Sequence, residues 1–253
     1  MSILVPATDP MRLSVVIPAH NEEGSVEETV RAVHDELVAE RIDHELVVVN
    51  DHSRDRTGEI LSELQRSIPE LVVEENPGPG GYGYAVRCGL ERAGGEAIAV
   101  MMADLSDSPA DLVRFYRKMQ EGYDCVFGSR WMRGGEVIDY PLLKRWMNRI
   151  ANNIIRLVFR LKYDDCTNAF KLYRRSTVEG LKPFLSPHFN LTLELPLKAI
   201  VRGYTYTVLP NSWRNRKTGE SKLRIKEMGS RYFFIMLYCL IEKYFSRGDF
   251  KKR

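Results

Sequence analysis

The 253-residue chain contains only four cysteines, and no two of them are close together. Cys88, Cys125, Cys166 and Cys239 are far apart, without a Cys-x-x-Cys pair. The stretch MSILVPATDP at the start lacks the charged end and the long apolar run of a signal peptide. We therefore expect the protein to work in the reducing cytoplasm.

Long apolar runs are also missing. The longest, YFFIMLYCLI at 232–241, has about half of the roughly 20 residues that a membrane-spanning helix needs, although it could lie on a membrane surface. We find no internal repeat and no low-complexity tract. With 44% apolar and 28% charged residues, the chain has the composition of a soluble globular protein.

The net charge of +3 is small, but the charges are unevenly distributed along the chain. Acidic residues gather at 21–75, whereas 130–175 and 202–231 are rich in arginine and lysine. A basic second half suits anionic ligands or an anionic membrane surface. The plainer alternative is that these cations lie on solvated helix faces.

Up to residue 129 the hydrophobic pattern alternates between short β-branched runs and amphipathic helices. This alternation predicts an α/β fold with a mostly parallel sheet covered by helices on both faces. Ser25 and Glu28 are placed to form a capping box, and Pro109 has a favoured first helical position. We expect strands at 13–17, 45–50, 70–75, 96–102 and 124–129, and helices at 25–37, 57–67, 84–93 and 109–122.

A longer helix is predicted at 141–161, with a stripe of apolar residues that includes Trp146 and with basic residues over the rest of its surface. A basic amphipathic helix of this kind suits the plane of a membrane interface. Packing against the sheet is the equally plausible alternative.

Polar residues follow several predicted strands, at the sheet edge where open parallel sheets hold ligands. They are Pro18–Glu22, Asn50 and Asp51, the loop GPGGYG at 78–83, Asp104, and Gly128–Arg130. Each has a purely structural alternative. Asn21, Asp55 and Ser108 could cap helices, and Asp51 could form a turn.

The loop at 78–83 also satisfies the dinucleotide-binding pattern GxGxxG through Gly78, Gly80 and Gly83, with Asp104 roughly 20 residues beyond. A dinucleotide-dependent oxidoreductase is therefore a rival hypothesis. Against it, the loop opens the third strand–helix unit instead of the first, and Pro79 stiffens it.

Eight segments, taken in order, resemble glycosyltransferase family 2, and in particular its branch of dolichol-phosphate-mannose synthases and related polyprenyl-phosphate sugar transferases. They are VVIPAHNEE, VVVNDHSRDRT, GPGGYGYAVRCGLERAGGE, MADLSDSP, VFGSR, DDCTNAFKLYRR, FNLTLELPLKAIVRGY and WRNRKTGESKLRIKEMG. The resemblance implies a single GT-A type, Rossmann-like catalytic domain at 1–229, followed by an apolar and basic helix at 230–253.

The resemblance further implies a nucleotide-sugar donor and a divalent metal, Mg²⁺ or Mn²⁺, on Asp104 at the donor diphosphate. Such cations prefer carboxylate, phosphate and water oxygens. The donor-binding residues carried over are Pro18, Ala19, Asn21, Glu22, Asp51, Gly81, Gly83, Ala103 and Asp104.

One position departs from the family pattern, because Met102 occupies a place where relatives typically have aspartate. A thioether is a poor ligand for a hard cation, so Met102 cannot replace the lost carboxylate. Asp107 is the candidate for a second metal ligand. Weak metal dependence, or a protein without activity, therefore remains open.

The acceptor that the resemblance implies is a polyprenyl or dolichyl phosphate. Its second pKa near 6 leaves it largely dianionic at neutral pH, so it needs cations around it and no general base. With Asp104, the candidate catalytic residues are Arg130, Arg145, Arg216 and Lys222, and Asp165, Thr167, Asn168 and Ser221 join Arg130 and Lys222 on the acceptor side. Glu194 matches a further family carboxylate whose role stays open.

Together these observations predict an inverting hexosyltransferase, of mannose or glucose type with a GDP- or UDP-linked donor, that rests peripherally on the cytoplasmic face of a membrane and has no nucleic-acid partner. Three alternatives stay open. They are a soluble family 2 transferase with a hydroxyl acceptor, a dinucleotide oxidoreductase, and a non-catalytic nucleotide-sugar sensor.

Overall fold

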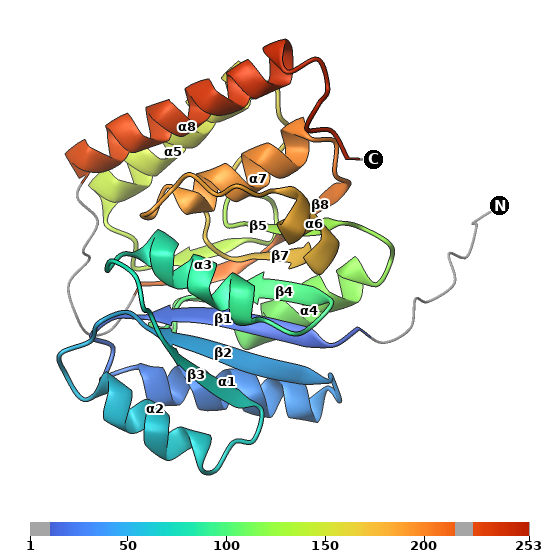
Figure 1. The fold of residues 1–253 in the computed structure, drawn as a ribbon. Coiled ribbons are helices and arrows are strands. Elements are labelled where there is room, and N and C mark those ends of the chain that lie inside the picture. The colour runs from blue at the N-terminus through green and yellow to red at the C-terminus, as the bar shows by residue number, and fades with distance from the viewer. Residues whose placement is uncertain (1–10, 216–224, 253) are drawn as a thin grey trace.

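The computed structural model describes residues 11–215 and 225–252, and the side chains of 225–228 are not included. A seven-stranded sheet in the order β3-β2-β1-β4-β7-β5-β8 forms its centre (Figure 1). The strands are β1 (Leu13–Ala19), β2 (His44–Asn50), β3 (Leu71–Glu75), β4 (Ala97–Val100), β5 (Cys125–Ser129), β7 (Lys171–Arg174) and β8 (Tyr206–Pro210).

The predicted α/β fold with a mostly parallel sheet is confirmed. β1 pairs in parallel with β2 and β4, β2 with β3, and β5 with β8. The exception is β7, which lies antiparallel between β4 and β5. β7 was not predicted from the sequence. Neither was a small two-stranded sheet of β6 (Glu136–Ile138) and β9 (Ser212–Arg214).

Helices cover both faces of the sheet because successive strand residues point in opposite directions. Val15 and Ile17 of β1 pack into one apolar core with α1 (Val26–Ala39), α2 (Thr57–Gln65) and α4 (Pro109–Met119). Val16 packs into a second core on the other face. That core holds α3 (Tyr82–Arg92), α5 (Leu142–Phe159), α6 (Arg175–Gly180), α7 (Leu191–Val201) and α8 (Ile225–Phe245).

The first helix begins after Ser25, as expected, but the predicted capping box is wrong. The Ser25 side chain makes no capping hydrogen bond, and its hydroxyl donates instead to Glu22 Oε2 at 3.1 Å. Ser25 therefore ties the start of α1 back to the loop that follows β1.

The helix predicted at 141–161 is α5, and α8 runs beside it on the outer side of the molecule (Figure 1). Lys243 Nζ of α8 donates to the carbonyl of Phe159 at the end of α5, at 3.3 Å. A buried ion pair between Arg202 and Glu242 joins α8 to the end of α7. Within the described ranges, every helix is too short or too polar to cross a membrane.

Candidate active site

An acidic loop follows β4 at the carboxyl edge of the sheet. Asp104 and Asp107 are both only 7% exposed. The backbone N–H of Ser106 donates to Asp104 Oδ1 at 3.2 Å, and that of Met102 donates to Asp107 Oδ2, also at 3.2 Å. Backbone amides thus fix both carboxylates in place, and Met102 contributes through its main chain.

The two carboxylates affect each other and lie within the field of Arg130. Burial and the nearby Asp104 raise the pKa of Asp107 to about 7, while the Met102 amide and Arg130 act in the opposite direction. The acidic loop and the predicted acceptor arginine therefore share one electrostatic environment.

The side chains of this loop fit a hard divalent cation. The Ser106 hydroxyl is buried and has no hydrogen-bond partner, and it lies close to Asp104 in the chain. In the part of the chain that the structure describes, no cluster of three or more His, Cys, Asp or Glu side chains could hold a metal. One or two carboxylates suit Mg²⁺ or Mn²⁺ if the remaining ligands are phosphate oxygens and water.

Asp51 joins three of the predicted donor-side segments. Its carboxylate accepts the Gly81 N–H at 2.8 Å and the Asn76 amide at 2.7 Å. Its own N–H donates to the carbonyl of Ala19, the last residue of β1, at 2.8 Å. The end of β1, the end of β2 and the glycine-rich loop thus meet at this carboxylate.

The other predicted donor residues lie along the same edge. The Asn21 side chain accepts the Arg54 N–H at 2.7 Å, and the Glu22 N–H donates to the Thr57 hydroxyl at 2.9 Å. Asn21 therefore joins two loops. Pro18 precedes Ala19 at the end of β1, and the Ala103 carbonyl accepts the Thr29 hydroxyl at 3.0 Å.

Gly83 is required by close packing. A Cβ at this position would lie 2.5 Å from both the Ser186 carbonyl oxygen and the Pro187 carbonyl carbon. One of the three glycines of the GxGxxG pattern, Gly83, is therefore explained by close contact with the loop at 186–188.

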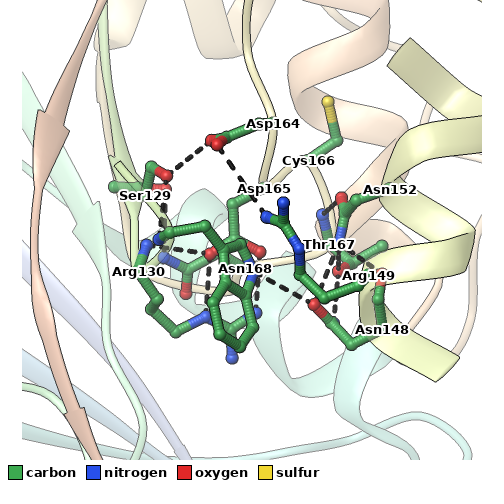
Figure 2. Close-up of polar contacts among 12 residues, drawn as sticks. Ser129, Arg130, Asn148, Arg149, Asn152, Asp164, Asp165, Cys166, Thr167 and Asn168 are labelled. Atoms are coloured by element: carbon green, nitrogen blue, oxygen red, sulfur yellow. Dashed lines mark hydrogen bonds and ion pairs between the residues drawn. The ribbon is translucent and has the colours of Figure 1, made fainter. Parts of the chain in front are cut away.

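On the basic side, Arg130 forms a buried ion pair with Asp165 (Figure 2). Its Nε and Nη2 donate to the two carboxylate oxygens of Asp165, each at 2.8 Å. This two-point pairing fixes the position of the guanidinium, so a phosphate bound beside it would meet a cation that does not move. The structure brings together Arg130 and Asp165, which are 35 residues apart in the sequence.

Thr167 and Asn168 hold the same loop in position. The Thr167 hydroxyl accepts the amides of Asn148 at 2.9 Å and Asn152 at 2.8 Å, both from α5. The Asn168 amide donates to the Gly128 carbonyl at 3.1 Å and to Asn211 at 3.0 Å. Their described contacts are structural, and a direct role in acceptor binding stays a prediction.

Three arginines surround the indole of Trp131, which sequence reasoning did not identify. The guanidinium carbons of Arg130, Arg145 and Arg149 lie 5.6, 5.5 and 5.2 Å from the ring centroid. Arg149 Nη1 is buried without a hydrogen-bond partner, 3.9 Å from Asp164 Oδ2. Arg149 was also missed, although its place one turn after Arg145 on a basic helix was a usable signal.

A row of aromatic rings connects this arginine cluster to the acidic loop. Trp131 lies 6.2 Å from Tyr140, and Tyr140 lies 4.9 Å from Trp213. Trp213 in turn makes a β-bridge with Asp107. The two charged halves of the candidate site are therefore neighbours.

Glu194 has a structural role in the fold. It is fully buried, pairs with Lys198 at 2.6 Å and accepts the N–H groups of Leu185 and Ser186. The other predicted residues, Arg216, Ser221 and Lys222, lie outside the described residues.

The fold is that of the GT-A glycosyltransferases, as the match to two solved structures of one such enzyme shows. A crystal structure of glucosyl-3-phosphoglycerate synthase from Mycobacterium tuberculosis, in complex with Mn²⁺, UDP and glucosyl-3-phosphoglycerate, matches with a TM-score of 0.69. The match covers 92% of this chain and 80% of the other, at 17% identity. Another structure of the same enzyme, with Mg²⁺ and UDP, matches with a TM-score of 0.66 over 92% of this chain and 79% of the other, at 18% identity.

The chain belongs to the glycosyl transferase family 2, whose sequence profile matches residues 14–181. A dolichol-phosphate mannosyltransferase from Pyrococcus furiosus is 31% identical over 85% of this chain and 60% of its own length. A polyprenol monophosphomannose synthase from Mycolicibacterium smegmatis is 30% identical over 84% of this chain and 81% of its own. The chain thus spans about three fifths of the first relative and four fifths of the second.

Proposed function

We propose that this glycosyltransferase moves a hexose, of mannose or glucose type, from a GDP- or UDP-linked donor to a polyprenyl or dolichyl phosphate. The observation that carries the proposal is the position of the arginine cluster around Trp131. It adjoins the acidic loop on one side and belongs on the other to α5, an amphipathic helix whose apolar face is exposed. The names of the two relatives agree with a lipid phosphate acceptor.

The donor would occupy the acidic half of the site. Asp51 and the strand ends beside it would hold the nucleotide. The diphosphate of the donor would lie toward Asp104, and Asp107 and Ser106 could supply further oxygen ligands to a metal there. A divalent cation bound there would neutralise the charge that develops on the departing diphosphate. Pro18, Ala19, Asn21, Glu22, Gly81, Gly83 and Ala103 complete this half as supports or contacts.

The acceptor phosphate would occupy the basic half, with Arg145 and Arg149 as its cations. Arg149 Nη1 is buried and makes no hydrogen bond, although Asp164 Oδ2 lies 3.9 Å away, and a phosphate oxygen is the acceptor that a guanidinium fits best. The guanidinium of Arg130, which is held in place by Asp165, would lie beside the same phosphate. Arg216, Ser221 and Lys222 stay assigned to this side by resemblance alone.

The chemistry requires no general base because the lipid phosphate is already ionised. One of its oxygens forms the new bond to the anomeric carbon, while the bond from that carbon to the diphosphate oxygen breaks on the opposite face. The configuration inverts, and the nucleoside diphosphate leaves with the electron pair. Catalysis then consists of positioning and charge stabilisation.

The surface of α5 and α8 supports attachment to a membrane. Among the described residues, the six most exposed large apolar side chains all belong to these two helices. They are Leu157, Phe245, Leu142, Leu143, Trp146 and Phe233. Residues 142–162 carry six cations and no acid, which suits the anionic lipids of a cytoplasmic leaflet.

The test is to incubate the purified protein with polyprenyl phosphate, Mn²⁺ and one radiolabelled donor at a time, namely GDP-mannose, UDP-glucose or UDP-N-acetylglucosamine. Label should enter the organic phase with one donor class. No extraction with any of the three would contradict the lipid-phosphate acceptor. Release of nucleoside diphosphate only when a soluble hydroxyl compound is added would favour a hydroxyl acceptor.

A further inference from the structure

The basic half of the candidate site contains a carboxylate besides that of Asp165. Asp164 lies in the loop between α5 and β7, and its side chain is 21% exposed. Figure 2 shows its carboxylate in contact with Ser129, at the end of β5, and facing Arg149 of α5. Because an acceptor phosphate is itself an anion, a second carboxylate at this place calls for a physical reason.

One oxygen of Asp164 holds the turn that carries Trp131. The Ser129 hydroxyl oxygen accepts the N–H groups of Trp131 and Met132, each at 3.2 Å, and so uses both of its lone pairs. Its proton is donated to Asp164 Oδ1 at 2.6 Å. Ser129 is fully buried, so its hydroxyl would lose a needed acceptor if the carboxylate were removed. Asp164 therefore fixes the turn on which the indole stands.

The other oxygen of Asp164 faces Arg149. Oδ2 lies 3.9 Å from Arg149 Nη1, a distance that allows charge attraction but no hydrogen bond. Among the described residues, Nη1 has no hydrogen-bond partner, and it has almost no exposed surface. Asp164 thus supplies a counter-charge to the buried end of this guanidinium.

The exposed part of Arg149 is not the part that faces Asp164. The side chain of Arg149 is 35% exposed, and because Nη1 is covered, this exposure belongs to its other atoms. The guanidinium also lies 5.2 Å from the centroid of the Trp131 ring. A phosphate that approaches the exposed side would therefore be separated from Asp164 by the arginine itself, and attraction to Arg149 would exceed repulsion by the carboxylate behind it.

We propose that Asp164 is a positioning residue for the acceptor phosphate. Through Oδ1 it holds the Trp131 turn, and through the charge on Oδ2 it keeps Arg149 beside the indole, with the rest of the guanidinium open to the phosphate. The inference rests on the proposed function and adds to it a residue that acts through Arg149 and touches neither substrate. Binding of the donor should not depend on it.

The test is steady-state transfer to a short-chain polyprenyl phosphate in detergent, with acceptor and donor varied in turn. Asp164→Asn keeps an acceptor for the Ser129 hydroxyl and removes only the charge, so the KM for the acceptor should rise about threefold, the value of a partly exposed ion pair. Asp164→Ala removes the hydrogen bond as well, and the rise should reach about tenfold. The KM for the donor should stay within about twofold in both variants.

Asp35→Asn is the matched control, because it removes one negative charge at an exposed position of α1, which packs on the other face of the sheet. It should leave both KM values unchanged. An Arg149→Met background tests whether Asp164 acts through Arg149, since Asp164→Asn should not raise the KM for the acceptor any further there. A residue that merely supports the fold would add the same rise in both backgrounds.

An unchanged or lowered KM for the acceptor in Asp164→Asn would overturn the inference, because Asp164 would then be idle or would only repel the phosphate. So would a rise that persists in the Arg149→Met background, or an equal rise in the KM for the donor. If the wild-type protein transfers sugar to polyprenyl phosphate and the variants match it, only the role of Asp164 is wrong. If the wild-type protein transfers none, the proposed function fails and this role with it.

Discussion

The two halves of the site hold their charges differently. On the donor side, Asp51, Asp104 and Asp107 each accept a backbone N–H, so main-chain dipoles fix them. On the acceptor side, arginines surround an indole, and Arg130 is paired with Asp165. The proposed donor half thus concentrates carboxylates, and the proposed acceptor half concentrates guanidinium groups.

The helices beside the two halves also differ, in how much of their apolar face is exposed. α4 buries its apolar face, with Leu112 and Phe115 fully covered, whereas α5 leaves Leu142, Trp146 and Leu157 exposed. Both helices have an apolar and a polar face, so the sequence pattern alone does not separate them. The apolar stripe of α4 is therefore part of the folded core, whereas most of the apolar stripe of α5 remains exposed.

The largest expected effect comes from removing the charge of the donor half. Asp104→Asn keeps the shape of the side chain, so the fold should persist, but turnover should fall at least about a thousand-fold because a cation at the diphosphate would lose its carboxylate ligand. Steady-state assays with purified variant measure this. Full activity in Asp104→Asn would remove the metal assignment and make the donor half structural.

The buried ion pair of the acceptor half should respond in stability as well as in activity. Arg130→Ala leaves Asp165 buried and unpaired, which typically costs about 3–5 kcal/mol of the free energy of unfolding. Urea unfolding of this variant measures the cost. The double variant Arg130→Ala/Asp165→Ala should recover part of the stability and none of the activity, and recovery of both would argue against a role for Arg130 at the acceptor.

The contrast between the two helices can be tested with two leucines. Leu112→Ala on α4, at a fully buried position, should lower the free energy of unfolding by about 2–5 kcal/mol. Leu157→Ala on α5, where the side chain is 80% exposed, should change it by less than about 0.5 kcal/mol and should instead weaken binding to anionic vesicles. A destabilised Leu157→Ala protein would indicate that α5 is covered by protein.

A smaller effect concerns Lys171, whose ammonium lies under the acceptor loop and donates to the carbonyls of Cys166, Asn168 and Thr192. Burial lowers its pKa to about 7, against the 10.5 expected in the unfolded chain. Above pH 7 the unfolded state therefore binds more protons, and stability attributable to Lys171 should rise with pH. The unfolding free energy of wild type, measured against Lys171→Met, should increase by about 1.5 kcal/mol between pH 7 and 8.5. No relative change would indicate that Lys171 stays charged.

The strands up to β5 and their helices were predictable because β-branched runs and helical periodicity are local signals. β7 was not, because its four residues KLYR contain Lys171, which is polar in sequence yet 1% exposed in the sheet. α7 carries Pro196 and is apolar on nearly every side, so it has no helical periodicity to detect. A structural ion pair was one possible role for its carboxylate, Glu194, but the partners, Lys198 and the N–H groups of Leu185 and Ser186, could not be predicted from the sequence.

At the site, Asp51 and Asp104 could be predicted because each follows a predicted strand, and open parallel sheets bind ligands at the carboxyl ends of their strands. The pairing of Arg130 with Asp165 and the arrangement of Arg145 and Arg149 around Trp131 depend on contacts between distant segments. No spacing in one sequence encodes such contacts. The GxGxxG pattern was misleading for a related reason, since Gly83 is needed for packing against Pro187.

The proposed function requires the nucleophile to be an ionised lipid phosphate held by the arginine cluster. The most direct measurement compares a polyprenyl phosphate with the unphosphorylated polyprenol of the same length as acceptors, at equal concentration in vesicles, with the labelled donor that supports transfer. We predict that label enters the phosphate lipid alone. Equal labelling of the alcohol would rule out a phosphate nucleophile, because a neutral hydroxyl needs a general base and gains nothing from the arginines around Trp131.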